Sequence, residues 1–374
     1  MTKKILIVTQ SEGGGLRRHL TDLMDGLIEQ NFEVVLAYNE EFGDDGFKRW
    51  LEIKKASQSL ILYNVSEMKR SISPLDDFLA IKRLMQIIRD EQPDIVHTHS
   101  SKAGVVGRIA AKLVGHKRVF YTPHAYSFLS GEFDGVHKKI FVFIEKILSR
   151  GFTTKTFNVS ESEKNAALEA NLDSPEKFKV ILNAVPKVVG FDYSAQRNRF
   201  GKNYARDFLV VNIARVTGQK NPALFVDIAT NIKKADPAIH FAWVGKIDSE
   251  YEQMISNQNA VDFIGEKNDT NSLVGAADLF LSTSLFEGLS YSLLEAASFG
   301  VPVFLSDVPG NSDFADMYSN AKLFSLQDTL ENQIEGLYSF INGIRKGKHA
   351  GDDGLELSYD HMIRQIIEEY FVEK

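Results

Sequence analysis

The sequence contains no cysteine, and none of its apolar runs approaches the ~20 residues that a membrane-spanning helix needs. The absence of cysteine excludes a disulfide framework, a zinc ribbon, a thiol nucleophile and a cysteine-bound cluster, and it suits a reducing compartment such as the cytoplasm. A net charge of −7 argues against a general nucleic-acid binder. Of the 374 residues, 44% are apolar and 25% charged, so we expect about two globular domains rather than a disordered chain.

The charge is unevenly spread along the chain. Residues 61–155 carry 15 Lys and Arg against 9 Asp and Glu, although the protein as a whole is acidic. A basic block in an acidic protein suggests that one face meets an anionic partner. The alternative is that surface helices in this block are simply rich in Lys and Arg.

Short apolar runs alternate with helical patterns from the N-terminus onwards. Runs that are apolar throughout are typical of strands covered by helices on both faces of a parallel sheet. The expected strands are Lys4–Thr9, Glu33–Tyr38, Ser59–Tyr63, Asp94–Thr98, Arg118–Thr122 and Lys155–Val159, and the expected helices are Leu16–Glu29, Ser73–Glu91 and Ala103–Val114. This alternation predicts a doubly wound parallel α/β sheet, with a first strand rather than a signal peptide at the N-terminus.

A second series of elements starts after an irregular polar stretch at residues 190–206. Its expected strands are Asp207–Ala214, Ile239–Val244, Val261–Ile264, Asp278–Ser282 and Pro302–Leu305, with helices from Pro222, near Thr270–Ala276 and at Ser292–Phe299. We therefore expect two Rossmann-like domains, at residues 1–185 and 186–355, and a C-terminal helix at residues 356–374 that packs back onto the first domain. Ligands bind beyond the carboxyl ends of strands in such folds, so we expect a cleft there between the two domains.

Three loops that follow expected strands of the first domain carry glycine or histidine. Gly14 and Gly15 precede a helix, where glycine lets the backbone approach an anionic ligand; a bare strand–helix turn is the alternative. His97 and His99 could ligate a metal, but no third ligand with suitable spacing follows, so we expect a polar lining of the cleft and no metal site. His124 follows the fifth strand, a position that favours a functional side chain.

The second domain carries two cations and two acids in similar loops. Arg215 and Lys220 lie at the start of a helix and would clamp a diphosphate, unless they are ordinary surface charges. Glu287 leaves a strand, and Glu295 follows eight residues later in the next helix. The backbone N–H groups between them suit a phosphate, and a carboxylate can accept two hydroxyls from a sugar or ribose. The alternatives are an exposed loop acid for Glu287 and a capping box formed by Ser292 and Glu295.

Taken together, these segments resemble the signature of retaining GT-B glycosyltransferases, specifically glycosyltransferase family 4. The resemblance rests on segments in the same order along nearly the whole chain: the Gly-rich first loop, Asp94-Ile95-Val96-His97-Thr98-His99, Thr122-Pro123-His124, Asn183, Arg215, Lys220, and Phe286-Glu287-Gly288 with Glu295 and Gly300-Val301-Pro302. The segment His99-Ser100-Ser101-Lys102-Ala103-Gly104 is most similar to members that build capsules, exopolysaccharides or O-antigens in bacteria.

The resemblance implies a hexosyltransferase that needs neither a metal nor another cofactor. It would move a hexose from a nucleotide-diphosphate sugar, with UDP favoured, to a saccharide or a polyprenyl-diphosphate-linked acceptor, with retention of configuration. The residues implied as catalytic are His124, Arg215, Lys220 and Glu287. Those implied for donor binding are Gly14, Gly15, Arg215, Lys220, Ile264, Glu287, Gly288, Leu289, Ser290, Tyr291 and Glu295. Those implied for acceptor binding are His99, Ser100, Lys102, His124 and Tyr126.

Two other functions stay open from the sequence. One is a different GT-B enzyme, such as a sugar-nucleotide epimerase, which would release nucleotide without any acceptor, or a phosphorylase, which would need inorganic phosphate. The other is a non-catalytic scaffold subunit of a partner transferase. The intact set of Glu287, Glu295, Arg215, Lys220 and His124 argues against the scaffold.

The segment at residues 137–150 mixes Lys and Arg with large apolar side chains, as interfacial helices do. It predicts that the first domain docks on the inner face of an anionic plasma membrane, where a lipid-linked acceptor would lie. The alternative is a helix of the first domain with one buried face.

Overall fold

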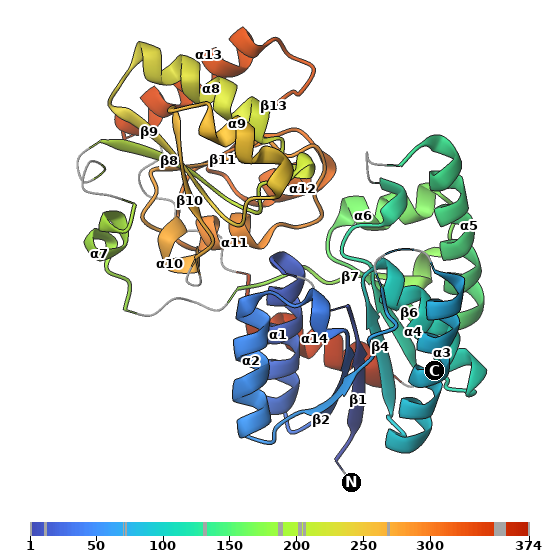
Figure 1. The fold of residues 1–374 in the computed structure, drawn as a ribbon. Coiled ribbons are helices and arrows are strands. Elements are labelled where there is room, and N and C mark those ends of the chain that lie inside the picture. The colour runs from blue at the N-terminus through green and yellow to red at the C-terminus, as the bar shows by residue number, and fades with distance from the viewer. Residues whose placement is uncertain are drawn as a thin grey trace. The chain divides into compact units, whose positions relative to one another are not determined.

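The computed structural model describes residues 2–10, 13–69, 71, 73–129, 133–185, 190–200, 204, 207–267, 270–347 and 357–372. Its contacts divide the chain into two compact units, each built on one parallel sheet (Figure 1). The first unit comprises Met1–Asn183 and Tyr359–Lys374, and the second comprises Ala184–Ser358. The domain boundaries expected at residues 186 and 356 lie outside the described residues.

The first unit contains a seven-stranded parallel sheet in the order β3-β2-β1-β4-β5-β6-β7. Its strands are β1 (Lys4–Val8), β2 (Glu33–Tyr38), β3 (Ile61–Asn64), β4 (Ile95–His99), β5 (Val119–Thr122), β6 (Lys155–Asn158) and β7 (Phe178–Val180). The central strands are almost wholly buried, as in a sheet covered on both faces. The chain order reverses between β1 and β4, and in open α/β sheets the crevice beyond such a reversal receives ligands.

Helices and short 3₁₀ turns connect these strands. They are α1 (Gly15–Glu29), η1 (Glu40–Phe42), α2 (Asp45–Ala56), α3 (Pro74–Glu91), α4 (Ser101–Leu113), η2 (Ser127–Leu129), α5 (Gly135–Phe152), α6 (Glu161–Glu169) and η3 (Pro175–Lys177). Leu84 of α3 and Val106 of α4 pack with Leu6 and Val35 in the core on one face of the sheet. Helices α1 and α14 pack together on the opposite face (Figure 1).

The last helix, α14 (Tyr359–Phe371), belongs to the first unit although it follows the second in the sequence. Its Tyr370 hydroxyl lies 2.6 Å from Nδ1 of His97, inside the first unit. Lys155 of β6 forms an ion pair of 2.6 Å with Glu369. These contacts join the end of the chain to the centre of the first sheet.

The second unit contains a six-stranded parallel sheet in the order β10-β9-β8-β11-β12-β13. Its strands are β8 (Phe208–Ile213), β9 (Ile239–Val244), β10 (Val261–Gly265), β11 (Leu279–Ser282), β12 (Val303–Ser306) and β13 (Ala321–Phe324). Its helices are α7 (Tyr193–Asn198), η5 (Gly218–Lys220), α8 (Pro222–Ala235), η6 (Ser249–Tyr251), α9 (Glu252–Ser256), α10 (Thr270–Val274), α11 (Tyr291–Ser298), α12 (Pro309–Met317) and α13 (Leu330–Arg345). Trp243 and Phe225 pack edge to face in its core.

The two sheets confirm the predicted fold class of two Rossmann-like parallel-sheet units. The predicted strands agree with the observed ones to within two residues at each end. The short edge strands β7 and β13 were not predicted, because only a few residues of each pair with a neighbour and their burial is incomplete. The stretch at residues 190–206, expected to be irregular, contains the short helix α7.

Candidate active site

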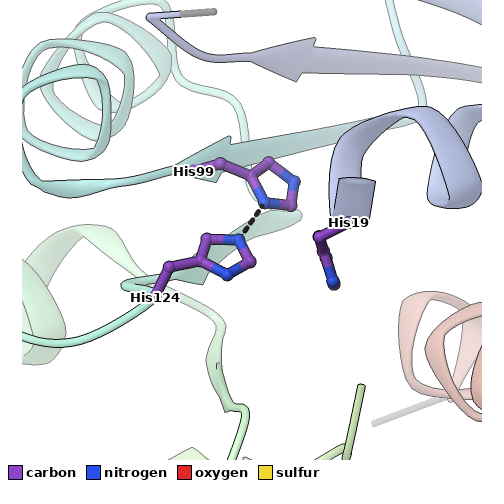
Figure 2. A group of neighbouring side chains, drawn as sticks. All are labelled: His19, His99 and His124. Carbon is purple, nitrogen blue, oxygen red and sulfur yellow. Dashed lines mark hydrogen bonds between the residues drawn. The ribbon is translucent and has the colours of Figure 1, made fainter. Parts of the chain in front are cut away.

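Three histidines meet at the carboxyl ends of β4 and β5 in the first unit (Figure 2). His99 is the last residue of β4, His124 lies in the loop after β5, and His19 projects from α1. Nδ1 of His99 lies 3.2 Å from Nε2 of His124, and the rings of His19 and His124 are 4.5 Å apart between centroids. The sequence predicted functional roles for His99 and His124 but missed His19, because nothing in the helical pattern of α1 distinguishes this residue.

Burial keeps these imidazoles neutral. Loss of solvent lowers the pKa of His19 to about 4, and a hydrogen bond from its Nδ1–H to Oδ1 of Asn183, 3.0 Å long, opposes this shift. The pKa values of His99 and His124 are also lowered well below the ordinary value, first by burial and then by the neighbouring histidines. At neutral pH the three side chains therefore offer lone pairs and N–H groups but no positive charge.

The loop that carries His124 has an unusual backbone. Both His124 and Ala125 adopt the left-handed conformation, with φ of 54° and 78°. The buried carboxylate of Glu163 accepts the N–H of Ala125 at 2.6 Å and the N–H of Val159 at 2.8 Å, which fixes this loop against the start of α6. Burial raises the pKa of Glu163 to about 7, although these donors favour the ionised form. Glu163 was not predicted, and its signal in the sequence is a capping box, Ser160-x-x-Glu163.

The other predicted residues of the first unit differ in their surroundings. Gly14 has a positive φ of 68° at the N-terminus of α1, which an added side chain would strain. Ser100 is also left-handed, and its buried hydroxyl has no hydrogen-bond partner in the described part of the chain. Lys102 forms an ion pair with Asp77. Tyr126, expected to bind the acceptor, is buried in a core cluster, because its ring stacks on Phe128 and its hydroxyl accepts from Asn158. Gly15 is the first residue of α1.

In the second unit, Lys220 and Glu287 form an ion pair at the carboxyl end of the sheet. Their side chains are 18% and 8% exposed, so the pair is mostly shielded from water. Two further bonds tie the loop of Lys220 to the loop of Glu287: Gln219 donates to the carbonyl of Phe286 at 2.9 Å and accepts the N–H of Leu285 at 2.8 Å. The structure therefore brings together one predicted cation and one predicted acid that lie 67 residues apart.

The loop of Glu287 also depends on a close approach between two backbones. A Cβ built on Gly310, in the first turn of α12, would lie 1.5 Å from the carbonyl oxygen of Gly288 and 2.8 Å from that of Glu287. No side chain fits at this position, so Gly310 allows α12 to support the loop. The sequence did not reveal this role, because the two segments meet only in the folded chain.

Arg215 is less constrained than Lys220. Its guanidinium is 44% exposed and lies 3.8 Å from the carboxylate of Asp248, at the end of β8. Arg215 thus keeps its charge accessible to an anion.

Ile264, the remaining residue expected to contact the donor, lies in β10 beside β9 and is half-buried.

Helix α11 begins at Tyr291, with Ser290 at its N-cap. The alternative of a capping box is wrong, because Ser292 lies inside the helix and its hydroxyl donates to the carbonyl of Ile213 at 2.6 Å. Glu295 is buried in the second turn. Gly288 and Leu289 precede the helix, so the residues from Glu287 to Tyr291 lead directly into its N-terminus, where backbone N–H groups favour anions.

Two parallel-sheet units, each with polar groups at the carboxyl ends of its strands, are the architecture expected of GT-B glycosyltransferases. Residues 13–187 match the model of Glycosyltransferase Family 4, and residues 194–343 match that of Glycosyl transferases group 1. The chain therefore belongs to the family 4 glycosyltransferases of the GT-B class, and it is a glycosyltransferase.

Individual relatives agree with this assignment. The chain is 29% identical over 300 residues to UDP-Gal:alpha-D-GlcNAc-diphosphoundecaprenol alpha-1,3-galactosyltransferase of Escherichia coli, covering 76% of this chain and 74% of that enzyme. It is 28% identical over 304 residues to the O-antigen biosynthesis glycosyltransferase WbnH of Escherichia coli, covering 81% of each. The crystal structure of Anabaena HepE in complex with UDP and glucose has the same fold, with a TM-score of 0.79, 19% identity and full coverage of both chains.

No helix in the described ranges is both long enough and apolar enough to cross a membrane.

Proposed function

We propose that this glycosyltransferase moves a hexose from a UDP-sugar to a saccharide or polyprenyl-diphosphate-linked acceptor, with retention, in the synthesis of a bacterial surface polysaccharide. The observation that carries the proposal is the Lys220–Glu287 pair beside the N-terminus of α11, because it combines a cation, an acid and helix amides in one place. The names of the Escherichia coli relatives, which refer to UDP-Gal, a diphosphoundecaprenol acceptor and O-antigen, support it. The UDP and glucose named in the HepE complex support the donor.

The second unit supplies groups for the donor. Lys220 and Arg215 neutralise the diphosphate as it leaves, together with the amides at the start of α11, so the reaction needs no metal ion or other cofactor. Glu287 accepts hydroxyls of the sugar, and Glu295 accepts those of the ribose. Ile264 and the backbone from Gly288 to Tyr291 line the donor.

The first unit supplies groups for the acceptor and for the transferred sugar. Gly14 and Gly15 allow backbone N–H groups to approach the diphosphate. His124 lies beside the sugar, and His99, Ser100 and Lys102 bind the acceptor. Tyr126 acts through the packing of the His124 loop rather than by direct contact.

The transfer itself follows same-face attack. The bond between the anomeric carbon and the diphosphate oxygen breaks, and a bond to the acceptor oxygen forms on the same face of the sugar. The proton of the acceptor hydroxyl passes to the departing diphosphate. A neutral His124, with no positive charge of its own, does not oppose the positive charge that develops on the sugar.

The proposal is tested by transfer assays with a panel of UDP-, GDP- and dTDP-sugars, chosen by thermal shift, and a polyprenyl-diphosphate-linked saccharide as acceptor. We expect a product whose anomeric configuration, read by NMR, equals that of the donor. Release of nucleotide without an acceptor and without a glycosylated product would instead indicate the epimerase. Failure of every donor and acceptor to react, with nucleotide binding intact, would support the scaffold.

We also propose that α5 places the first unit on an anionic membrane. Four apolar side chains recur on one face of this helix and are exposed: Val136, Ile140, Phe143 and Ile147, at 65%, 48%, 63% and 47%. Exposed Lys139 and Arg150 lie on the same helix. One face of α5 is buried, as the alternative of a buried-face helix expects, since Leu148 and Ser149 are buried, but these four side chains lie on another face. An apolar stripe with cations beside it is typical of helices that lie in the membrane interface.

Flotation with vesicles tests this placement. Wild-type protein is expected to float with vesicles that contain anionic lipid and to be released by salt, while a Phe143→Ser, Ile147→Ser double variant stays unbound. Leu113→Ser is the matched control, because Leu113 on α4 is 59% exposed in the same unit. Equal flotation of the double variant and the control would reject α5 as the membrane contact.

A further inference from the structure

The three histidines of the first unit form a constellation that the proposed reaction does not fully use. One ring nitrogen of each of His19, His99 and His124 lies within 4.8 Å of those of the other two. They come from three different elements, so the fold rather than a local sequence motif brings them together (Figure 2). Only His99 and His124 have a role in the proposed transfer.

One of these distances fits a shared metal ion. Two nitrogens bound to a tetrahedral Zn²⁺ at 2.0–2.1 Å each lie about 3.3 Å apart, and Nδ1 of His99 is 3.2 Å from Nε2 of His124. The other nitrogen of His99 is buried and makes no hydrogen bond within the described residues. His99 therefore lacks a second hydrogen bond that would fix its tautomer within the described residues, so its Nδ1 can present a lone pair to an ion.

The surroundings hold the imidazoles in the state that binds a metal. Nδ1–H of His19 donates to Oδ1 of Asn183, which leaves Nε2 as the nitrogen with a lone pair. A metal-bound histidine almost always donates its second ring N–H to an oxygen, such as that of a carboxylate, a backbone carbonyl or water, and Oδ1 of Asn183 takes this place for His19. Glu163 fixes the left-handed loop that carries His124, and His124 is half-buried, which leaves a route for the ion and a fourth ligand.

We propose that His19, His99 and His124 together bind one Zn²⁺ ion, with the fourth position open to water, and that this ion inhibits sugar transfer. Imidazole ligands suit zinc and neighbouring transition metals, whereas Mg²⁺ and Ca²⁺ prefer oxygen. The inhibition rests on the proposed function, because a zinc ion on Nε2 of His124 removes that atom from the donor sugar. The binding of zinc does not depend on the reaction.

Metal binding is measured first, on the full chain freed of metal by chelation. We expect one equivalent of Zn²⁺ by equilibrium dialysis and the visible absorption of tetrahedral Co²⁺ when cobalt replaces zinc. His19→Ala and His124→Ala should each weaken zinc binding by at least about tenfold, and Asn183→Ala by about 10–100-fold, as for other partners of a metal-bound histidine. His137→Ala, which removes an exposed histidine on α5, is the matched control and should bind as the wild type does.

Thermal unfolding of each variant without metal separates lost folding from lost binding. A variant that melts as the wild type does but gains no stability from Zn²⁺ has lost the site. Absence of zinc binding by the wild type, or binding that survives in both His19→Ala and His124→Ala, would overturn the site.

Transfer assays then test the inhibition. Zn²⁺ should inhibit the wild type, and His19→Ala should need at least about tenfold more zinc for the same effect. Zinc that binds at one equivalent without changing transfer would overturn the inhibitory role alone. A chain that transfers no sugar but binds zinc at these residues would instead refute the proposed function and leave the metal site standing.

Discussion

The two units use opposite means to hold polar groups at the ends of their sheets. In the first unit, burial makes three histidines neutral, and hydrogen bonds that Asn183 accepts from His19 and Glu163 accepts from the His124 loop hold them in place. In the second unit, Lys220 and Glu287 keep a mostly buried ion pair. A buried charge is tolerated only with a partner, so a ligand that enters the second unit must replace that partner, whereas a ligand of the first unit meets lone pairs without a charge.

Replacing Glu287 should have the largest effect, because it disrupts the Lys220–Glu287 ion pair of the second unit and lowers the rate of sugar transfer. Glu287→Ala leaves Lys220 without its carboxylate and removes the acceptor of the sugar hydroxyls. Loss of one preorganised group of this kind costs about 10²–10³-fold in turnover. Initial rates of transfer, with circular dichroism to verify the fold, measure the effect. Glu287→Gln, which keeps the shape and one acceptor oxygen, is the comparison, and a near-normal rate for Glu287→Ala would reject the role of this acid.

Substitution of Gly310 tests whether the packing of α12 against the Glu287 loop matters as much as the charge of Glu287. Gly310→Ala forces a methyl group against the carbonyl oxygen of Gly288, and overpacking of this kind typically costs about 1–3 kcal/mol. Gly336→Ala in α13 is the matched control, because its added Cβ meets only Phe304, at 3.5 Å. In a Trp50→Phe background, Trp243 is the only tryptophan and reports urea unfolding of the second unit.

We expect Gly310→Ala to lower both the unfolding midpoint and the affinity for UDP. Gly336→Ala, in a helix interior, should raise the midpoint slightly, since alanine is the better helix former. Equal midpoints for the two variants would show that α12 yields easily and that the close approach is not needed.

The cations of the second unit should differ from each other. Lys220→Ala and Arg215→Ala each remove a charge-assisted contact worth about 1.5–3 kcal/mol, with Arg215 at the lower end because it is half exposed. Titration calorimetry with UDP measures both losses, and Lys234→Ala on the exposed face of α8 is the control. An unchanged affinity for UDP in either variant would remove that cation from the diphosphate site.

Sequence patterns predicted those strands and helices whose apolar residues follow a local, regular pattern. Apolar runs such as β1 and β8 predicted both sheets, since a strand covered on both faces must be apolar along its length. Position at the end of a strand predicted His99, His124 and Glu287, because parallel strands deliver their following loops to one edge.

Such local patterns could not predict contacts between segments that are far apart in the sequence. His19 lies on a helix and reaches His99 only through the packing of α1 against the sheet. Gly310 meets Gly288 because α12 folds back on the preceding loop. The sequence also could not show whether Phe143 on α5 is exposed or buried, because a helical repeat shows that a face is apolar but not what covers it.

The smallest expected effect is the pH dependence of the first unit, where His19 and Glu163 act in opposite directions. His19 has a pKa of about 4 when folded and about 6.5 when unfolded, so the stability it contributes is complete above pH 6.5 and is lost as the pH falls. Glu163 has a pKa of about 7 when folded and about 4.5 when unfolded, so its protonated form favours the folded state at low pH, and this contribution is lost as the pH rises.

Two variants should therefore change the slope of the free energy of unfolding against pH in opposite directions between pH 4.5 and pH 6.5. Each uncompensated proton changes the free energy of unfolding by about 1.4 kcal/mol per pH unit. His19→Gln should reduce the loss of stability that the wild type shows as the pH falls. Glu163→Gln should increase this loss, because the carboxyl group whose titration opposes that of the three neutral histidines is then absent. Urea unfolding in chelator, followed by Trp50 in a Trp243→Phe background, reports on the first unit alone. If both variants change the slope in the same sense, burial does not set the charge of these groups, and the contrast between the two units fails.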